Sequence, residues 1–129
     1  MTTKCWGYYN DGGYHLILNL SGCDVEKMKD KEHIQNCVNE ILEKTNMHAI
    51  GPTIFEYAEL NDEHIAVAGY TVVQIITTSC LVMHMAEHSN AIYFDFISCK
   101  KYDKEDVKDI VFKYFYCSSM SEVFLTRKV

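Results

Sequence analysis

The sequence predicts an α/β (α+β) fold: a two-layer sandwich in which two helices lie on one face of a mostly antiparallel sheet. The chain has 129 residues, which suits one domain with one hydrophobic core. Hydrophobic residues form 48% of it and charged residues 23%, the balance of an ordinary globular protein. About six strand-like segments and only two long amphipathic segments fit that architecture. A single proline leaves no candidate linker, so one domain is expected over 1–129.

The first half of the chain predicts a strand, a long helix and a second strand. Residues 14–20 (YHLILNL) are apolar and alternate, which is typical of a strand with one buried face. Residues 25–44 predict a helix, because their apolar residues fall largely on one face at helical spacing and charges fill the other. Residues 47–58 are expected to form a second strand after a turn at Asn46, with a bend at Gly51-Pro52, followed by the polar loop 59–64 (ELNDEH).

The second half predicts further strands and one more helix. Residues 65–76 are rich in β-branched side chains, and residues 91–98 (AIYFDFIS) alternate strictly, so both predict strands. A second amphipathic helix is expected over 104–116 and a last strand over 122–127. Residues 79–88 fit either a strand or a short helix, and this choice decides which chemistry the segment can perform.

As a helix, the segment SCLVMHMAEH would carry a metal-site pattern. Cys80, His84 and His88 would share one helix face. The stretch HMAEH matches H-x-x-E-H, in which two histidines bind zinc and Glu87 would act as a base. The pattern fixes only three positions, so it arises often by chance. A zinc site also needs a third protein ligand, and no acidic helix stands out downstream, so we expect no metal site.

As a strand, the same segment would separate its two most reactive groups. Alternation puts Ser79 on one face and His84 on the other, unless the chain bends between them. A serine in a strand is most often a hydrogen-bonded hydroxyl, and a cysteine such as Cys99 at a strand end most often packs. Periodicity alone therefore assembles no catalytic site here.

Charge and cysteine usage argue against several partners and compartments. The net charge of −6 argues against nucleic acid, because phosphate binding needs a basic face. No run approaches the roughly 18 to 20 apolar residues of a membrane span, and the first residues lack the apolar core of a signal peptide. The cysteines form no C-x-x-C pair, which favours free thiols in a reducing cytoplasm. They are Cys5, Cys23, Cys37, Cys80, Cys99 and Cys117.

The spacing of the candidate chemical residues is more specific than any of these patterns. His84 follows Ser79 by five residues, and Cys99 follows it by twenty. Thr71 precedes the serine by eight residues, in a G-x-T stretch. Residues 13–24 (GYHLILNLSGCD) add a histidine-led strand that runs into Gly-Cys-Asp. Together these features resemble the prokaryotic S-adenosylmethionine decarboxylases, a family of small pyruvoyl enzymes, and the resemblance covers nearly the whole chain.

The resemblance implies a self-made cofactor and a role for each matched residue. The hydroxyl of Ser79 would attack the carbonyl of Thr78, and elimination and hydrolysis would leave a pyruvoyl group in place of the serine. That group would form a Schiff base with the substrate amine and accept the electrons left when CO2 departs. His84 would accept the proton during elimination, and Thr71 would donate to the oxyanion of the acyl shift. Cys99 would return a proton to the substrate Cα.

The resemblance also implies a substrate, a partner and a pathway. The substrate would be S-adenosylmethionine, the product would serve polyamine and spermidine synthesis, and the enzyme would be a homodimer. The chain departs from the family at Thr78, where the family has glutamate, and at Cys80, where it has histidine. The stretch around Ala86 lacks the family's tryptophan and proline. Two alternatives follow from these departures: the same scaffold decarboxylating another amino acid, or an uncleaved relative that is not an enzyme.

Overall fold

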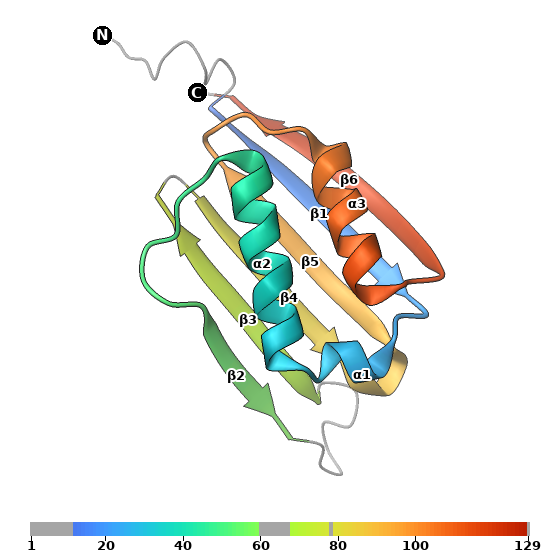
Figure 1. Cartoon of the computed structure of the whole chain (residues 1–129). Coiled ribbons are helices and arrows are strands. Elements are labelled where there is room, and N and C mark those ends of the chain that lie inside the picture. Colours follow the sequence, from blue (N-terminus) through green and yellow to red (C-terminus); the bar gives the residue numbers. More distant parts are fainter. Residues whose placement is uncertain (1–11, 60–67, 78, 129) are drawn as a thin grey trace, which may run out of the picture.

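The computed structural model describes residues 12–59, 68–77 and 79–128. Its six strands form one sheet in the order β2-β3-β4-β5-β1-β6, and every neighbouring pair is antiparallel (Figure 1). In chain order the elements are β1 (Gly13–Ser21), α1 (Val25–Met28), α2 (Lys31–Thr45), β2 (Ile54–Ala58), β3 (Gly69–Ile76), β4 (Ser79–Ala86), the 3-10 turn η2 (Glu87–Ser89), β5 (Ala91–Ser98), α3 (Lys104–Phe115) and β6 (Ser119–Arg127).

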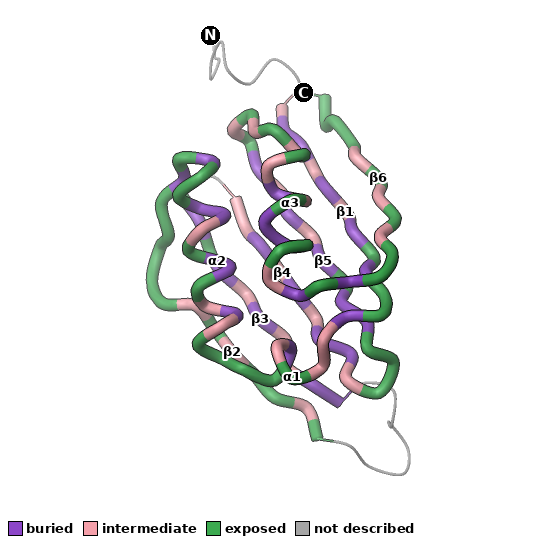
Figure 2. The backbone as a smooth tube through the Cα atoms, turned by 45° about the vertical axis from the view of Figure 1, so that its right-hand side comes forward, coloured by how far each residue is buried: buried purple, intermediate pink, exposed green. Residues whose placement is uncertain are grey.

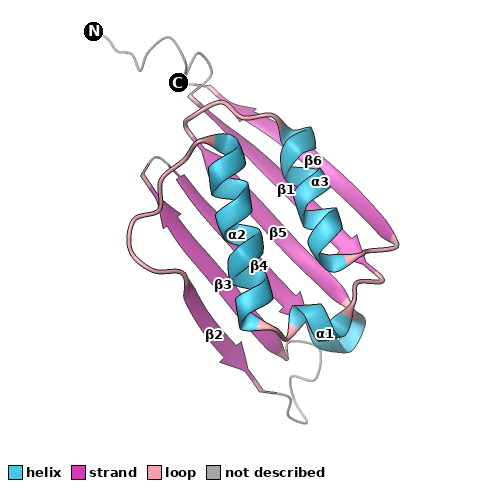
Figure 3. Cartoon of the chain, in the orientation of Figure 1, coloured by secondary structure: helices cyan, strands magenta, loops and turns pink. Residues whose placement is uncertain are grey.

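Helices α2 and α3 lie across one face of the sheet, with the short α1 near one end (Figure 3). This confirms the predicted two-layer sandwich. Alternate residues of the central strands point toward the helices, and the apolar faces of α2 and α3 meet them. Phe94, Phe96 and Phe115 are among the largest fully buried side chains, each stabilising the fold by about 1.5–3 kcal/mol relative to exposure. Among the helices described, none is long and apolar enough to cross a membrane.

The helix predicted over 25–44 is in fact two helices, so its expected continuity is wrong. The side chain of Asp30 accepts a hydrogen bond from the backbone N–H of His33 at 3.1 Å and so caps the start of α2. A short aspartate satisfies free backbone donors better at a helix start than in a helix interior, and this divides the segment. α2 ends where Asn46 takes a left-handed φ of 56°.

The strand predicted over 47–58 is also too long. Only Ile54–Ala58 forms β2. Gly51 takes a left-handed φ of 71°, and Pro52 follows with no backbone N–H to donate, so the chain cannot stay in a ladder there. The composition of the segment was strand-like, but these two adjacent residues decided its course.

The other predicted elements agree closely with the structure. The strands predicted over 14–20 and 91–98 match β1 and β5 to within one residue at each end. The second helix ends at Phe115, and β6 begins at Ser119, earlier than predicted. Residues 65–67 of the strand predicted over 65–76 lie outside the described residues.

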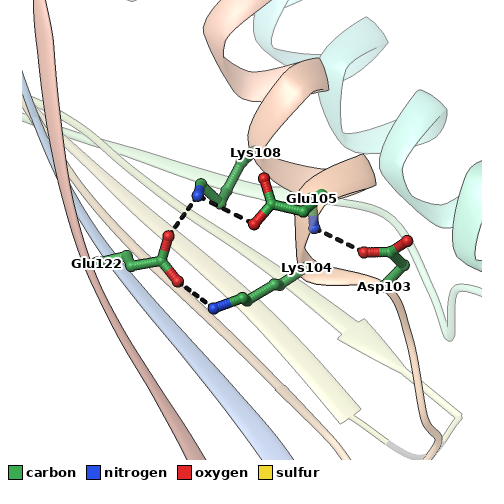
Figure 4. A network of polar contacts seen from close by, with 5 residues as sticks. All are labelled: Asp103, Lys104, Glu105, Lys108 and Glu122. Atoms are coloured by element: carbon green, nitrogen blue, oxygen red, sulfur yellow. Dashed lines mark hydrogen bonds and ion pairs between the residues drawn. The ribbon is translucent and has the colours of Figure 1, made fainter.

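An ion network ties α3 to the edge strand β6 (Figure 4). Glu122 accepts a hydrogen bond from Lys104 Nζ at 2.6 Å and another from Lys108. Lys108 also donates to Glu105 at 3.2 Å. Asp103 caps the start of α3 by accepting from the backbone N–H of Glu105 at 2.9 Å. The hydrogen bonds from Lys104 and Lys108 hold the pKa of Glu122 below its usual range.

None of the described helices covers the opposite face of the sheet, called here the open face (Figure 1). Buried and less buried residues alternate along the central strands, as Figure 2 shows, because successive side chains point to opposite faces. The larger apolar side chains that point to the open face include Ile17, Ile54, Val73, Ile75, Val82, Tyr93, Ile97, Val123 and Leu125. Large exposed apolar surfaces of this kind mark contact sites.

Candidate active site

The cleavage position predicted from the sequence lies at the turn between β3 and β4. Ile76 ends β3 and pairs with Ser79, which begins β4, so residues 77 and 78 alone connect the two strands. Thr78 itself lies outside the described residues. On their other sides, β3 pairs with β2 and β4 pairs with β5. A break between residues 78 and 79 would therefore open a turn and leave every strand pairing intact.

Ser79 lies opposite Ser98 of β5, at the same end of the sheet as the last turn of α2. Ser79 Oγ lies 3.9 Å from the sulfur of Met47, and Ser98 Oγ lies 3.8 Å from the same sulfur. The buried Ser98 hydroxyl also donates to the carbonyl of Lys100 and accepts from its N–H, both at 2.8 Å. These contacts fix the chain just beyond β5 against the start of β4.

Cys99 follows Ser98 directly, so the structure brings it to the same end of the sheet as Ser79. Its side chain is exposed, and Cys80 is half-buried. The other described cysteines are buried, as expected, and burial raises their thiol pKa: Cys23, Cys37 and Cys117. Because the thiolate is the reactive form and needs access, Cys99 and Cys80 are the described thiols suited to chemistry.

His84 and Thr71 form a separate pair. They lie opposite each other on β4 and β3, and Thr71 Oγ1 is 3.0 Å from His84 Nδ1. The ring of Tyr93 stacks parallel to the imidazole, with centroids 6.3 Å apart. This pair is on the open face, whereas Ser79 points toward the helices, as strand alternation predicted. Five residues along a strand also separate Ser79 from His84 by roughly 16 Å, so one chain does not bring them together.

The H-x-x-E-H pattern does not form a zinc site, because it requires a helix and the segment is not helical. Residues 79–86 form β4, whose Leu81, Met83 and Met85 are buried against the helices. The strand spreads the would-be ligands out: His84 lies on the open face, and His88 lies beyond the strand in η2. Over residues 12–59, 68–77 and 79–128, no three His, Cys, Asp or Glu side chains are grouped to hold a metal ion.

A small pocket of about 160 Å³ lies beside the turn before Ser79. It is lined by Asn46, Met47, His48, Ile76, Thr77 and Lys100. Sequence reasoning missed this pocket, because its walls come from the end of α2, the end of β3 and the residues after β5. No local pattern links segments that lie so far apart in the chain.

A second polar cluster lies at the far end of β4. Tyr57 donates to Glu87 Oε1 at 3.0 Å, and burial together with this carboxylate raises the pKa of Tyr57. The other carboxylate oxygen of Glu87 is buried and has no hydrogen-bond partner among the described residues. His88 and Lys29 line the same depression, of about 360 Å³. Sequence reasoning had considered Glu87 only as the base of the zinc pattern.

A polar pair also lies on the open face beside the central strands. His15 Nε2 is 2.9 Å from Asp95 Oδ1, across β1 and β5. His15 belongs to the histidine-led strand of residues 13–24 that carried the family resemblance, but no role was predicted for either residue. Apolar residues lie directly around this pair: Asp95 is paired with Val82 on one side and Ile17 on the other.

Comparisons with known proteins identify the family. The family model for S-adenosylmethionine decarboxylase matches residues 14–128. Among solved structures, the chain is similar to the adenosylmethionine decarboxylase from Aquifex aeolicus VF5, with a TM-score of 0.74, 16% sequence identity and coverage of 91% of each chain. At that identity, the likeness shows the shared fold. No curated protein matches the chain significantly. Because the family model spans nearly its whole length, this chain belongs to the S-adenosylmethionine decarboxylase family.

Proposed function

We propose that this chain is a self-processing, pyruvoyl-dependent decarboxylase that acts on S-adenosylmethionine. One observation carries the proposal: Ser79 begins β4 only three residues after β3 ends at Ile76, and it lies opposite Ser98, the neighbour of Cys99 in the chain. A serine there can attack the carbonyl before it without the loss of any strand pairing. The family match over residues 14–128 supports the same chemistry.

Processing would use this chain's own atoms and water. The Ser79 hydroxyl attacks the carbonyl carbon of Thr78, the C–N bond breaks, and an ester forms. A base removes the α-proton of Ser79, the Cβ–Oγ bond breaks, and the electron pair leaves with the Thr78 carboxylate. The resulting enamine takes up water and releases ammonia, which leaves a pyruvoyl group. The products are chains of 1–78 and 79–129.

The surroundings of Ser79 fit such a group. It would be a small ketone at the start of β4, and once bound to substrate it supplies the electron sink that decarboxylation of an α-amino acid requires. The pocket beside the turn is small and partly polar. Cys99 lies next to the residue opposite Ser79 and is exposed, so its thiol can return a proton to the substrate Cα.

The Thr71–His84 pair points to a homodimer. The pair lies on the open face, on the opposite side of the sheet from the Ser79 side chain. We propose that a second copy packs on the open face and supplies the proton acceptor and the oxyanion donor of each processing site. These two groups would act on backbone atoms at the start of β4, the α-proton of Ser79 and the carbonyl oxygen before it, rather than on the Ser79 hydroxyl that points toward the helices. The exposed apolar side chains of this face, such as Val123 and Leu125, support such an interface.

The proposed product would be decarboxylated S-adenosylmethionine, which we expect to serve polyamine synthesis in the cytoplasm. A second candidate keeps the scaffold and changes the substrate to another amino acid, such as a basic one. One observation favours this alternative: no aromatic residue lines the described pocket beside Ser79. Stacking of a base on an aromatic ring contributes about 1–3 kcal/mol, so an adenosyl group would lose that contact there.

The first experiment is the denatured mass of freshly purified protein, with Ser79→Ala as the matched control. We expect two fragments divided between residues 78 and 79, the second with a keto N-terminus, and an intact Ser79→Ala chain. CO2 release from S-adenosylmethionine and from basic amino acids then identifies the substrate. A single intact wild-type chain after long incubation would instead identify an uncleaved, non-enzymatic relative.

A further inference from the structure

Two buried cysteines, Cys23 and Cys117, come from distant parts of the chain and meet at one end of the sheet. Cys23 lies between β1 and α1, and Cys117 lies between α3 and β6. The antiparallel pairing of β1 with β6 ends at Ser21 and Ser119, and each cysteine lies two residues beyond that last pair. The cysteines are therefore placed opposite each other where this strand pairing stops.

Backbone hydrogen bonds connect the same two segments on both sides of the cysteines. The N–H of Ser118 donates to the carbonyl of Ser21 at 2.9 Å. The N–H of Asp24 donates to the carbonyl of Phe115, also at 2.9 Å. Opposite residues in an antiparallel pair lie roughly 4.5–5.5 Å apart between Cα atoms, and a disulfide spans roughly 4.4–6.8 Å between them. The spacing of the two segments therefore suits a disulfide.

Both thiols also lie on the same side of these segments. Each cysteine is 4% exposed, and both belong to the hydrophobic core between the sheet and the helices. Burial and, second to it, the neighbouring Cys117 thiol raise the pKa of Cys23 to about 12. The two thiols are thus close enough to affect each other. The pKa of the equally buried Cys37 is raised by burial and by Glu40 instead.

The cleavage proposed at residues 78 and 79 would place the two cysteines on different chains. The chain 1–78 would carry Cys23 with β1, β2 and β3, and the chain 79–129 would carry Cys117 with β4, β5 and β6. In the sheet, β1 lies between β5 and β6, so one strand of the first chain is inserted between two strands of the second (Figure 1). A bond between the cysteines would fix this inserted strand to its neighbour.

We infer that Cys23 and Cys117 form a disulfide when a small disulfide such as oxidised glutathione is present, and that this bond joins the two processed chains. One cysteine thiolate attacks a sulfur of the oxidant and releases one small thiolate. The other cysteine thiolate then attacks the mixed disulfide and releases the second. The two cysteine protons pass to the released thiolates, and the oxidant gains the two electrons. The disulfide itself does not depend on the proposed function, whereas its linking of two chains does.

The burial of both thiols makes this reaction slow. The thiolate is the reactive form, and a raised pKa keeps it scarce at neutral pH. The free thiols expected in a reducing compartment therefore persist, and only sustained exposure to the oxidant converts them. Because the thiolate fraction grows tenfold with each pH unit below the pKa, we expect oxidation to be roughly tenfold faster at pH 8 than at pH 7.

The test measures whether the two chains separate without a reductant. Processed full-length protein is incubated with oxidised glutathione at pH 8 and denatured with iodoacetamide, which blocks the remaining thiols, and its mass is measured. We expect one species with the summed mass of both chains, which dithiothreitol separates. Cys23→Ala and Cys117→Ala should each give two separate chains. Cys37→Ala removes an equally buried thiol and Cys80→Ala a more accessible one, and both should keep the link.

A second measurement does not need processing or a cysteine variant. The intact Ser79→Ala chain is oxidised in the same way and digested, and the peptides that contain Cys23 and Cys117 should be found joined. Separate peptides after long oxidation, each with a blocked thiol, would overturn the inference. A link that survives in Cys23→Ala would assign the bond to other cysteines and overturn it too. Wild type that is never cleaved but carries the joined peptides would refute the proposed function and support the disulfide.

Discussion

Thr71 and His84 face each other across β3 and β4, 3.0 Å apart, on the side of the sheet opposite to the Ser79 side chain. The family resemblance implies that these two residues and Ser79 act in one reaction. Their arrangement in one chain separates the proposed acceptor of the serine proton from the serine itself. If each processing site takes these groups from a second copy, as we propose, two inactive variants should complement each other.

Complementation between two inactive variants should restore cleavage. His84→Ala and Ser79→Ala, expressed alone, should remain intact. Expressed together, they should form mixed dimers in which the serine of the first variant meets the histidine of the second. We expect the His84→Ala chain to be cleaved in this mixture, as read by mass. If it stays intact while wild type is cleaved, the two groups act within one chain and the shared site is wrong.

Removing the Thr71 hydroxyl should slow the acyl shift. We expect Thr71→Val to reduce the cleavage rate by roughly a hundredfold, because one donor to a developing oxyanion typically contributes that much. Thr71→Ser keeps the donor and should process at nearly the wild-type rate. The measurement is the half-time of cleavage after rapid purification. Equal rates in the valine and serine variants would exclude a role for the hydroxyl.

Replacing Cys99 should separate self-cleavage of the chain from turnover of the substrate. Its proposed role comes after CO2 leaves, so Cys99→Ala should still cleave between 78 and 79 but should release little decarboxylated product. Cys80→Ala, at the other accessible described thiol, is the matched control and should retain turnover. Fragment masses and product formation are measured on the same samples. Full turnover by Cys99→Ala would show that another group returns the proton.

The ion network between α3 and β6 should stabilise the protein above a threshold pH. The lysines lower the pKa of Glu122 in the folded chain. The stabilisation that its ionised carboxylate gives to the folded state is therefore complete above the usual carboxyl pKa, and it is lost as pH falls through the lowered value. Glu122→Gln in a Ser79→Ala background should lower the free energy of unfolding at pH 7 by about 1 kcal/mol. The difference in free energy of unfolding between the proteins with and without this substitution should shrink toward pH 3.

Urea unfolding at pH 7 and pH 3 checks this prediction, with Asp109→Asn as a control on the exposed side of α3. The control should change stability little at either pH. If Glu122→Gln lowers the free energy of unfolding of the Ser79→Ala protein by the same amount at both pH values, the carboxylate charge does not stabilise the fold.

Local patterns in the sequence determined the secondary structure and the fold class. Strict alternation predicted β5 correctly, and apolar spacing predicted α3, because side-chain burial in strands and helices has periods that a single segment displays. The same reasoning failed where one residue mattered more than periodicity. Asp30 divided a helix, and the bend predicted at Gly51-Pro52 ended the extended segment altogether, so that the strand begins only at Ile54.

The sequence also suggested a candidate chemistry, because the spacing of Ser79, His84 and Cys99 resembles that of the family. It left residues 79–88 open, since both a strand and a short helix fitted them. Tertiary packing decided the matter: Leu81, Met83 and Met85 are buried against the helices only if the segment is extended. That choice removed the zinc pattern and placed His84 on the open face.

Only the tertiary structure decided which residues surround the cleavage position. Ser79 meets Ser98 through strand register, and register depends on the burial of whole strands rather than on local sequence. Met47 and Lys100 reach the same pocket because α2 and β5 both end at that edge of the sheet. The sequence thus named the candidate residues, and the packing of distant segments set their neighbours and the face on which each one lies.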